Sequence, residues 1–260
     1  LGSNQLDMRL STLPGVHGES VVLRILDRSD TAVALTALGM PESILKQYQG
    51  VITQPHGMIL ITGPTGSGKT TTLYATLEKI NSETQKIITV EDPVEYQLDG
   101  ITQIQANASI GLSFAAGLRS IVRQDPDVLM VGEIRDHETA EIAIESALTG
   151  HLVFSTLHTN DAAGAVTRLQ DMGVEGYLIS SSLLAIQAQR LVRRVCTDCA
   201  STGPISADEL AVLQITREEC PEINRGHGCE SCGHTGYRGR VGLYELLLMS
   251  DAIRHHVASG

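Results

Sequence analysis

The sequence predicts an α/β fold with a mostly parallel sheet, followed by a small subdomain that binds a metal. Short apolar runs rich in Ile, Val and Leu alternate with segments of helical periodicity, and this alternation is typical of a parallel sheet covered by helices on both faces. A glycine-rich loop joins the first of these runs to a helix. Two C-x-x-C pairs lie in an irregular stretch near the end of the chain.

The chain divides into parts of different character. Residues 1–28 contain two short β-like runs, and because two strands alone are marginally stable, we expect them to be the tail of a truncated N-terminal α+β domain. The remaining parts are a linker and helix at 29–50, the α/β core at 51–195, a tetracysteine element at 196–240 and the start of a truncated C-terminal helical region at 241–260.

The elements are predicted from the spacing of apolar residues. Short continuous apolar runs indicate buried strands, whereas apolar residues three and four apart indicate helices. Pro41 is compatible with a helix start and Gly150 with a helix end. The expected strands are Met58–Thr62, Ile87–Glu91, Val128–Val131 and Leu152–Thr156. The expected helices are Ala32–Tyr48, Lys69–Asn81, Ser113–Gln124, His137–Leu148, Ala162–Met172 and Tyr177–Val195.

Composition and charge exclude several classes of protein. The net charge is −11, and the chain has no Trp and only two Phe, so neither a strongly basic surface nor a stacking platform for nucleic acid is expected. No apolar run approaches the roughly 18 residues that span a bilayer, and no signal peptide opens the chain. Any role at a membrane is therefore expected to act through a partner.

Residues 63–70 read GPTGSGKT, which is a complete G-x-x-x-x-G-K-[ST] phosphate-binding loop. A β-rich run precedes it and a helical segment follows it, so backbone amides and a helix N-terminus face a bound polyphosphate. We expect Lys69 to pair with the β- and γ-phosphates of ATP and the Thr70 hydroxyl to ligate Mg²⁺. The predicted nucleotide-binding residues are Gly63, Pro64, Thr65, Gly66, Ser67, Gly68, Lys69, Thr70 and Thr71.

Acidic residues follow the next two predicted strands. The run from Ile88 to Tyr96 ends in three carboxylates, which lie at the carboxyl end of a strand, where ligands of open α/β sheets bind; a solvated acidic turn is the alternative. The strand Val128–Val131 ends in Gly132-Glu133 and has the form of a Walker B strand. In a Walker B strand, a Mg²⁺-ligating Asp would occupy the position of Gly132. This chain has glycine there, so we expect Glu133 to contact the metal through water.

Two histidines, His151 and His158, bracket the predicted strand Leu152–Thr156. A single histidine is usually structural. Two histidines that flank a strand near a phosphate loop make a phosphate-sensing role equally plausible.

The motifs EDPVEY, GEIRDHETAEIA, TGHLVFSTLHTNDA and AQRLVRRVC follow the phosphate loop in that order. In this combination the chain resembles the secretion ATPase superfamily over nearly its whole length, above all the type II secretion ATPases of the GspE family and, next, the pilus assembly ATPases. The resemblance implies a RecA-like P-loop NTPase core. It implies a cytoplasmic ATPase motor, peripheral at the inner membrane, that hydrolyses ATP to drive type II secretion by pseudopilus assembly.

The resemblance also implies roles for individual residues. Glu95 would be the catalytic carboxylate that orients and deprotonates water, and Glu133 would be the Walker B acid. His151 and His158 would form a His box near the γ-phosphate.

Two arginines of the N-terminal tail, Arg9 and Arg24, match residues that reach across to the γ-phosphate in this superfamily. Guanidinium groups on a separate domain can stabilise the transferring phosphoryl group as arginine fingers. Without the resemblance, exposed strand charges would be the favoured interpretation of both.

The resemblance further implies a homo-oligomer, a hexamer in the family, and contact with inner-membrane secretion platform proteins through a missing N-terminal region. A type IV pilus extension ATPase is the alternative in the same class. A nucleic-acid motor and a non-catalytic, zinc-dependent binding module are alternatives from other classes; the net charge of −11 disfavours the first.

Four of the five cysteines form two C-x-x-C pairs, Cys196/Cys199 and Cys229/Cys232. Each pair can supply half of a tetrahedral site, and four thiolates with no place for water predict a structural Zn²⁺. Redox dithiols, and His227 or His234 as substitute ligands, are the less favoured alternatives. Cys220 is expected to be a free thiol outside the site.

Overall fold

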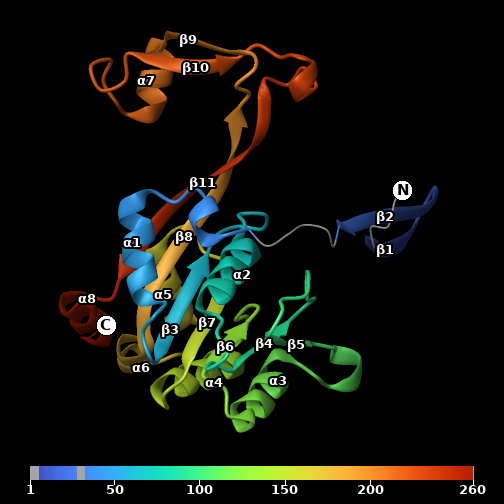
Figure 1. The fold of residues 1–260 in the computed structure, drawn as a ribbon, viewed down its shortest axis with the longest axis vertical. Helices are drawn as coiled ribbons and strands as arrows, with labels where there is room; N and C mark the ends of the chain where they lie inside the picture. The colour runs from blue at the N-terminus through green and yellow to red at the C-terminus, as the bar shows by residue number, and fades with distance from the viewer. Residues whose placement is uncertain (1–5, 28–32, 260) are drawn as a thin grey trace. The chain divides into compact units, whose positions relative to one another are not determined.

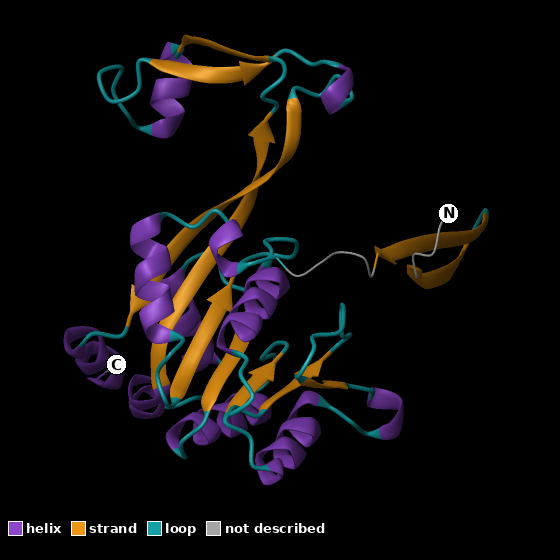
Figure 2. Cartoon of the chain, in the orientation of Figure 1, coloured by secondary structure: helices purple, strands orange, loops and turns teal. Residues whose placement is uncertain are grey.

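The computed structural model describes residues 6–27 and 33–259, and the chain separates into two compact units (Figures 1 and 2). One unit contains residues 1–189 together with 244–260, and the other contains residues 190–243. The second unit includes the predicted tetracysteine element at 196–240.

The first unit is built on a seven-stranded sheet with the order β11-β8-β3-β7-β6-β4-β5. All the pairings from β8 to β5 are parallel, as predicted. The strands are β3 (Gly57–Thr62), β4 (Ile87–Glu91), β5 (Thr102–Gln105), β6 (Val128–Val131), β7 (Leu152–Leu157), β8 (Leu183–Val195) and β11 (Tyr237–Leu248).

Helices cover both faces of this sheet. Successive side chains of a strand point to opposite faces, so Met58 and Leu60 of β3 join one core while Ile59 and Ile61 join the other. The first core contains α3 (Phe114–Ile121), α4 (His137–Leu148), α5 (Ala162–Asp171), α6 (Gly176–Ser182) and α8 (Asp251–Ser259). The second contains the 3₁₀ turn Leu35–Ala37, α1 (Glu42–Val51) and α2 (Lys69–Ile80).

Several helices begin at a side chain that caps the first turn. Ser113, Asp136 and Asp161 accept hydrogen bonds from amides three residues later, which satisfies donors that have no partner within the helix. Gly150 follows the end of α4 with a φ of 111°, a value that favours glycine. Local sequence therefore sets the predicted limits of α4 closely.

The predicted helix Tyr177–Val195 is wrong. Only α6 is helical there, and residues 183–195 form β8, which pairs with β3 in parallel from Leu183 to Ala188. Residues of β8 up to Gln189 are buried or half-buried. A strand covered on both faces has no polar alternation, so its apolar run cannot be told from a buried helix by periodicity.

The predicted helix Ala32–Tyr48 is also corrected. A 3₁₀ turn occupies Leu35–Ala37, and α1 starts only after Pro41, which takes the N-cap position. Gly39 between them has a φ of 80°, so a continuous helix cannot pass through it. The strands β5 and β11 were not predicted. In particular, residues 241–248, expected at the start of a helical region, belong to β11.

The N-terminal tail forms an antiparallel hairpin of β1 (Leu6–Gly15) and β2 (Gly18–Asp27). Arg9 stands opposite Arg24 in its register. In the described residues, no helix has the length and apolar character to span a bilayer.

The second unit has little apolar core. It contains a two-stranded antiparallel sheet of β9 (Ala200–Pro204) and β10 (Glu222–Gly226), the short helix α7 (Ala207–Leu213) and a 3₁₀ turn at Glu230–Cys232. These elements correct the expectation that the stretch around the cysteines is irregular. Apart from Cys196 and Cys232, the buried apolar side chain described in this unit is that of Ile205. Hydrophobic burial alone is therefore a weak source of stability for it.

Candidate functional site

The carboxyl ends of four neighbouring strands, β3, β7, β6 and β4, form one edge of the sheet. A predicted site segment follows each strand there: the glycine loop after β3, His158 after β7, Glu133 after β6 and Asp92 after β4. Open α/β sheets bind their ligands outside this edge. The topology thus brings together segments that are distant in sequence.

Residues 63–68 form the loop between β3 and α2. Gly63, Gly66 and Gly68 have φ values of 148°, 77° and 89°, a region that favours glycine. Helix α2 begins at Lys69, so its first amides have no intrahelical partners and are available to an anion. The exposed side chains that border this loop are those of Pro64, Thr65, Thr70 and Thr71.

A cluster of charged and polar side chains connects the loop to β7 and β6. The Lys69 Nζ donates to the Gly63 carbonyl at 2.7 Å and lies 3.5 Å from His158 Nδ1. His158 Nε2 lies 3.5 Å from Glu133 Oε2, and Glu133 Oε1 accepts from Arg135 at 2.6 Å. Burial lowers the pKa of Lys69, and the nearby Glu133 opposes that shift. The loop lysine, one histidine and the acid after β6 therefore share one site.

The two glutamates near the end of β4 lie in different environments. Glu91 is 3% exposed, and its carboxylate accepts hydrogen bonds from Tyr74, Thr89 and Gln103. Glu95 is exposed, and its backbone N–H donates to the Tyr74 hydroxyl at 3.2 Å. Of the two, Glu95 has the carboxylate that is accessible to a substrate or a water.

Glu91 and Tyr74 form a buried pair beneath the segment that carries Glu95. Burial raises the pKa of Glu91 against the opposing effect of its hydrogen bonds. Burial and the adjacent Glu91 also raise the pKa of Tyr74, which therefore stays a neutral donor. The Tyr74 ring lies edge-on to that of Tyr96 with centroids 4.6 Å apart. These contacts hold the segment after β4 against α2.

The structure does not bring His151 to this cluster, which corrects the expectation that both histidines face one phosphate. His151 precedes β7 at its amino end, and its carbonyl accepts from Gly57 N at the start of β3. Its Nδ1 lies 2.9 Å from the Ser146 carbonyl of α4. His158 follows the carboxyl end of the same strand, about 23 Å away at roughly 3.3 Å per residue.

The side chains of Arg9 and Arg24 lie outside the described part of the chain. The backbone places the two residues opposite each other in the hairpin. Their predicted contact with a γ-phosphate stays a prediction.

Two polar residues of β8, Gln187 and Gln189, contribute to this region and were missed by sequence reasoning. Both are buried, at 0% and 3% exposure, and Gln189 hydrogen-bonds to the phosphate loop. Two glutamines spaced by two within an otherwise apolar run are the available signal. The erroneous helix over residues 177–195 hid it, because this spacing places them on one face only in a strand.

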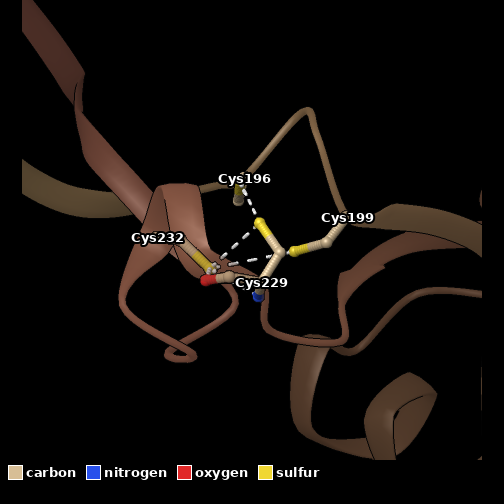
Figure 3. A group of neighbouring side chains, drawn as sticks. All are labelled: Cys196, Cys199, Cys229 and Cys232. Carbon is tan, nitrogen blue, oxygen red and sulfur yellow. Dashed lines mark hydrogen bonds between the residues drawn. The ribbon is translucent and has the colours of Figure 1, made fainter.

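Figure 3 shows four cysteine side chains converging on one point in the second unit. Their sulfur atoms all lie within 4.8 Å of one another, with separations of 3.9 Å (Cys196–Cys229), 3.9 Å (Cys199–Cys232) and 3.7 Å (Cys229–Cys232). Four thiolates about 2.3 Å from a tetrahedral Zn²⁺ lie about 3.8 Å apart. The predicted tetracysteine cluster is confirmed, and its geometry fits zinc.

Backbone amides stabilise the thiolate form of Cys232 in this cluster, whereas burial raises the pKa of Cys199 to about 11. The Cys229 and Gly236 amides donate to the Cys232 sulfur at 3.2 and 3.3 Å. These bonds lower the pKa of Cys232 to about 6. The His227 ring contacts the Ser201 hydroxyl instead of joining the group of four.

Comparison with known proteins gives relatives for the whole chain. Residues 1–260 match the protein family described as "Type II/IV secretion system protein". The chain is 53% identical over 260 residues to the type II secretion system protein E of Klebsiella pneumoniae, and 52% identical over 259 residues to the type II secretion system ATPase E of Vibrio cholerae. In each case the alignment covers 100% of this chain and 52% of the relative. The chain thus spans about half the length of these curated relatives.

Among solved structures, the chain resembles the pilus retraction motor PilT crystallised with ADP. The TM-score is 0.67 at 30% sequence identity, and the match covers 98% of this chain and 67% of PilT. This likeness supports the predicted fold of the core.

Proposed function

This chain belongs to the family of type II/IV secretion system proteins, and we propose that it is the ATP-hydrolysing part of a cytoplasmic motor for type II protein secretion. Its 53% identity to a type II secretion protein supports this proposal, and a type IV pilus extension ATPase is the alternative. We further propose that it acts as a hexamer at the inner membrane and contacts the secretion platform through a region outside this chain.

One observation carries this proposal. Lys69 is the first residue of α2, whose first amides have no intrahelical partners and border the glycine loop. The Lys69 Nζ lies 3.5 Å from His158, which in turn contacts Glu133. The loop supplies donors for a triphosphate, and the cluster beside it holds a lysine, an imidazole and a carboxylate. Binding and activation groups for phosphoryl transfer therefore meet at one edge of the sheet.

We assign the chemical roles as follows. The loop amides and Lys69 bind the phosphates, and the exposed Thr70 hydroxyl is available to the Mg²⁺ that accompanies ATP. Glu133 acts as the Walker B acid and reaches the Mg²⁺ through water. His158 contacts the terminal phosphate. Glu95 accepts a proton from the attacking water, a role that rests on the family resemblance and on the exposure of its side chain.

Positive charge from outside the core completes the proposed site. Arg9 and Arg24 act as arginine fingers on the transferring phosphoryl group, a role that rests on the family resemblance and on their pairing in one hairpin. The four cysteines bind one structural Zn²⁺, which would hold the second unit together.

The general-base assignment is tested by measuring phosphate release and nucleotide binding in two variants. Glu95→Gln is expected to lower turnover by at least about a hundredfold, within the range of general-base contributions, while a non-hydrolysable ATP analogue binds as before. Glu83→Gln is the control, since Glu83 is an exposed residue in the turn between α2 and β4, at the other edge of the sheet. Equal turnover in Glu95→Gln and the parent would refute the assignment.

A further inference from the structure

Gln189 of β8 touches the phosphate loop at both of its ends. Its side-chain Nε2 donates to the Ser67 carbonyl at 2.8 Å. Its backbone oxygen lies so near Gly63 that a Cβ there would be 2.3 Å from it. The same residue reaches the following helix, because Thr72 Oγ1 donates to its Oε1 at 2.9 Å. The backbone of Gln189 thus packs against the start of the loop, and its buried side chain connects the end of the loop to the first turn of α2.

The bond to Ser67 fixes the direction of a peptide group in the cradle. The Ser67–Gly68 peptide is trans and planar, so the Ser67 carbonyl and the Gly68 N–H point in opposite directions. While the carbonyl points into the protein toward Gln189, the Gly68 N–H points to the opposite side. A loop with this peptide reversed would instead direct a carbonyl oxygen, with its partial negative charge, toward a phosphate.

We propose that Gln189 is a positioning residue that preorganises the phosphate loop by holding the Ser67–Gly68 peptide with its N–H toward the bound nucleotide. This inference rests on the proposed ATP binding at the loop. Gln189 does not touch the nucleotide itself. It removes a conformational cost that a mobile loop would otherwise add to each binding event.

The direction of the Gln189 amide is also set by its neighbours. Its Oε1 accepts from Thr72 and, at 3.0 Å, from the Gln187 Nε2, which leaves Nε2 of Gln189 to face Ser67. Both partners are donors to the oxygen, so a flipped amide would set NH₂ against NH₂ at Gln187. The network therefore selects the orientation that engages the loop.

Gln187 supplies a matched control on the same strand and the same face. It is fully buried, like Gln189, but the bond it donates goes to Gln189 and not to the loop. Within the described part of the chain, its Oε1 has no hydrogen-bond partner. Replacing Gln187 with Met removes that unsatisfied acceptor, so the cost to folding is small. Thr72 still donates to the Gln189 Oε1 in this variant, and the Gln189 amide keeps its direction toward Ser67.

The test compares Gln189→Met with Gln187→Met in binding of a Mg²⁺-bound non-hydrolysable ATP analogue and in steady-state hydrolysis. Gln189→Met is expected to weaken analogue binding and raise KM by about tenfold, with kcat within about twofold, because it removes binding common to ground and transition states. Gln187→Met is expected to stay within about twofold of the parent in both constants. A merely structural role would reduce the folded fraction and kcat at unchanged KM.

Equal KM values in Gln189→Met and the parent would overturn the inference, as would equal losses in both variants. A parent chain that binds no analogue would instead refute the proposed function. If Gln189→Met does not fold, Gln189→Asn tests the same point, because it keeps a buried amide that is one methylene too short to donate to the Ser67 carbonyl. It is expected to raise KM at constant kcat, and an unchanged KM would contradict the proposal.

Discussion

At the scale of single residues, Glu91 shows how a carboxylate can belong to a site without being available to a substrate. Asp92, which follows Glu91 in the sequence, and Glu95, the proposed general base, lie on the segment after β4. Glu91 and Tyr74 hold that segment against α2. The sequence alone shows three acids at the end of one strand. Their spacing does not indicate which of them is accessible to a substrate. Burial and the hydrogen bond from the Tyr74 hydroxyl of α2 separate Glu91 from the exposed Asp92 and Glu95.

The pKa of Glu91 predicts a pH dependence of stability. Its value in the folded protein is raised above the ordinary 4.5, so the protonated carboxyl is favoured by folding. That contribution is complete below the unfolded pKa and is lost as the pH rises through the folded pKa. Relative to Glu91→Gln, the parent should therefore lose free energy of unfolding as the pH rises above 4.5.

Urea denaturation followed by circular dichroism at several pH values measures this difference; the chain has no Trp for fluorescence. A difference between parent and Glu91→Gln that is constant with pH would contradict the assigned shift. A difference that moves in favour of the parent as the pH rises would reverse its sign.

At the scale of elements, prediction succeeded where a local signal sets a boundary. The strand Ile87–Glu91 and the helix His137–Leu148 were predicted with their observed limits. Gly150, predicted to end this helix, follows α4 with a left-handed φ, and the Asp136 side chain caps its start. For β8 no such signal exists, since its identity as a strand depends on pairing with β3, a segment more than a hundred residues earlier.

The cap of α4 offers a test at this scale. Asp136 follows the segment that carries Glu133 and accepts from Thr139 N at 2.8 Å. Asp136→Ala should lower the free energy of unfolding by about 1 kcal/mol, whereas Asp136→Asn should retain most of it because Asn is an equally good cap. Urea denaturation measures both. Equal losses in the two variants would show that the carboxylate charge, not the cap, is responsible.

At the scale of the whole chain, stability comes from different sources in its two units. The first unit buries apolar side chains on both faces of a sheet, and the second gathers four cysteines around a point with little apolar burial. In the sequence, only the cysteine spacing and the lack of helical or strand periodicity indicated that residues 190–243 form a separate unit. The strands that enter and leave that unit, β8 and β11, were invisible to the same reasoning.

Metal removal should therefore affect the two units unequally. Freshly purified, reduced protein is expected to contain about one zinc per chain, and a chelator should increase amide hydrogen exchange in residues 190–243 while strands β3, β6 and β7 stay protected. Cys232→Ser should reproduce the effect, and Cys220→Ser, whose sulfur donates to the Glu222 carbonyl outside the cluster, should not. Loss of protection throughout the sheet would contradict this separation.

The central claim is that the loop at the start of α2 binds a nucleoside triphosphate, and calorimetric titration tests it most directly. Titration of a Mg²⁺-bound non-hydrolysable ATP analogue into the parent chain should give saturable heat for one site. Lys69→Ala should weaken that binding by at least about tenfold, which corresponds to about 1.4 kcal/mol for a lost charge-assisted contact. No heat of binding in the parent, or the same affinity in Lys69→Ala, would contradict the account.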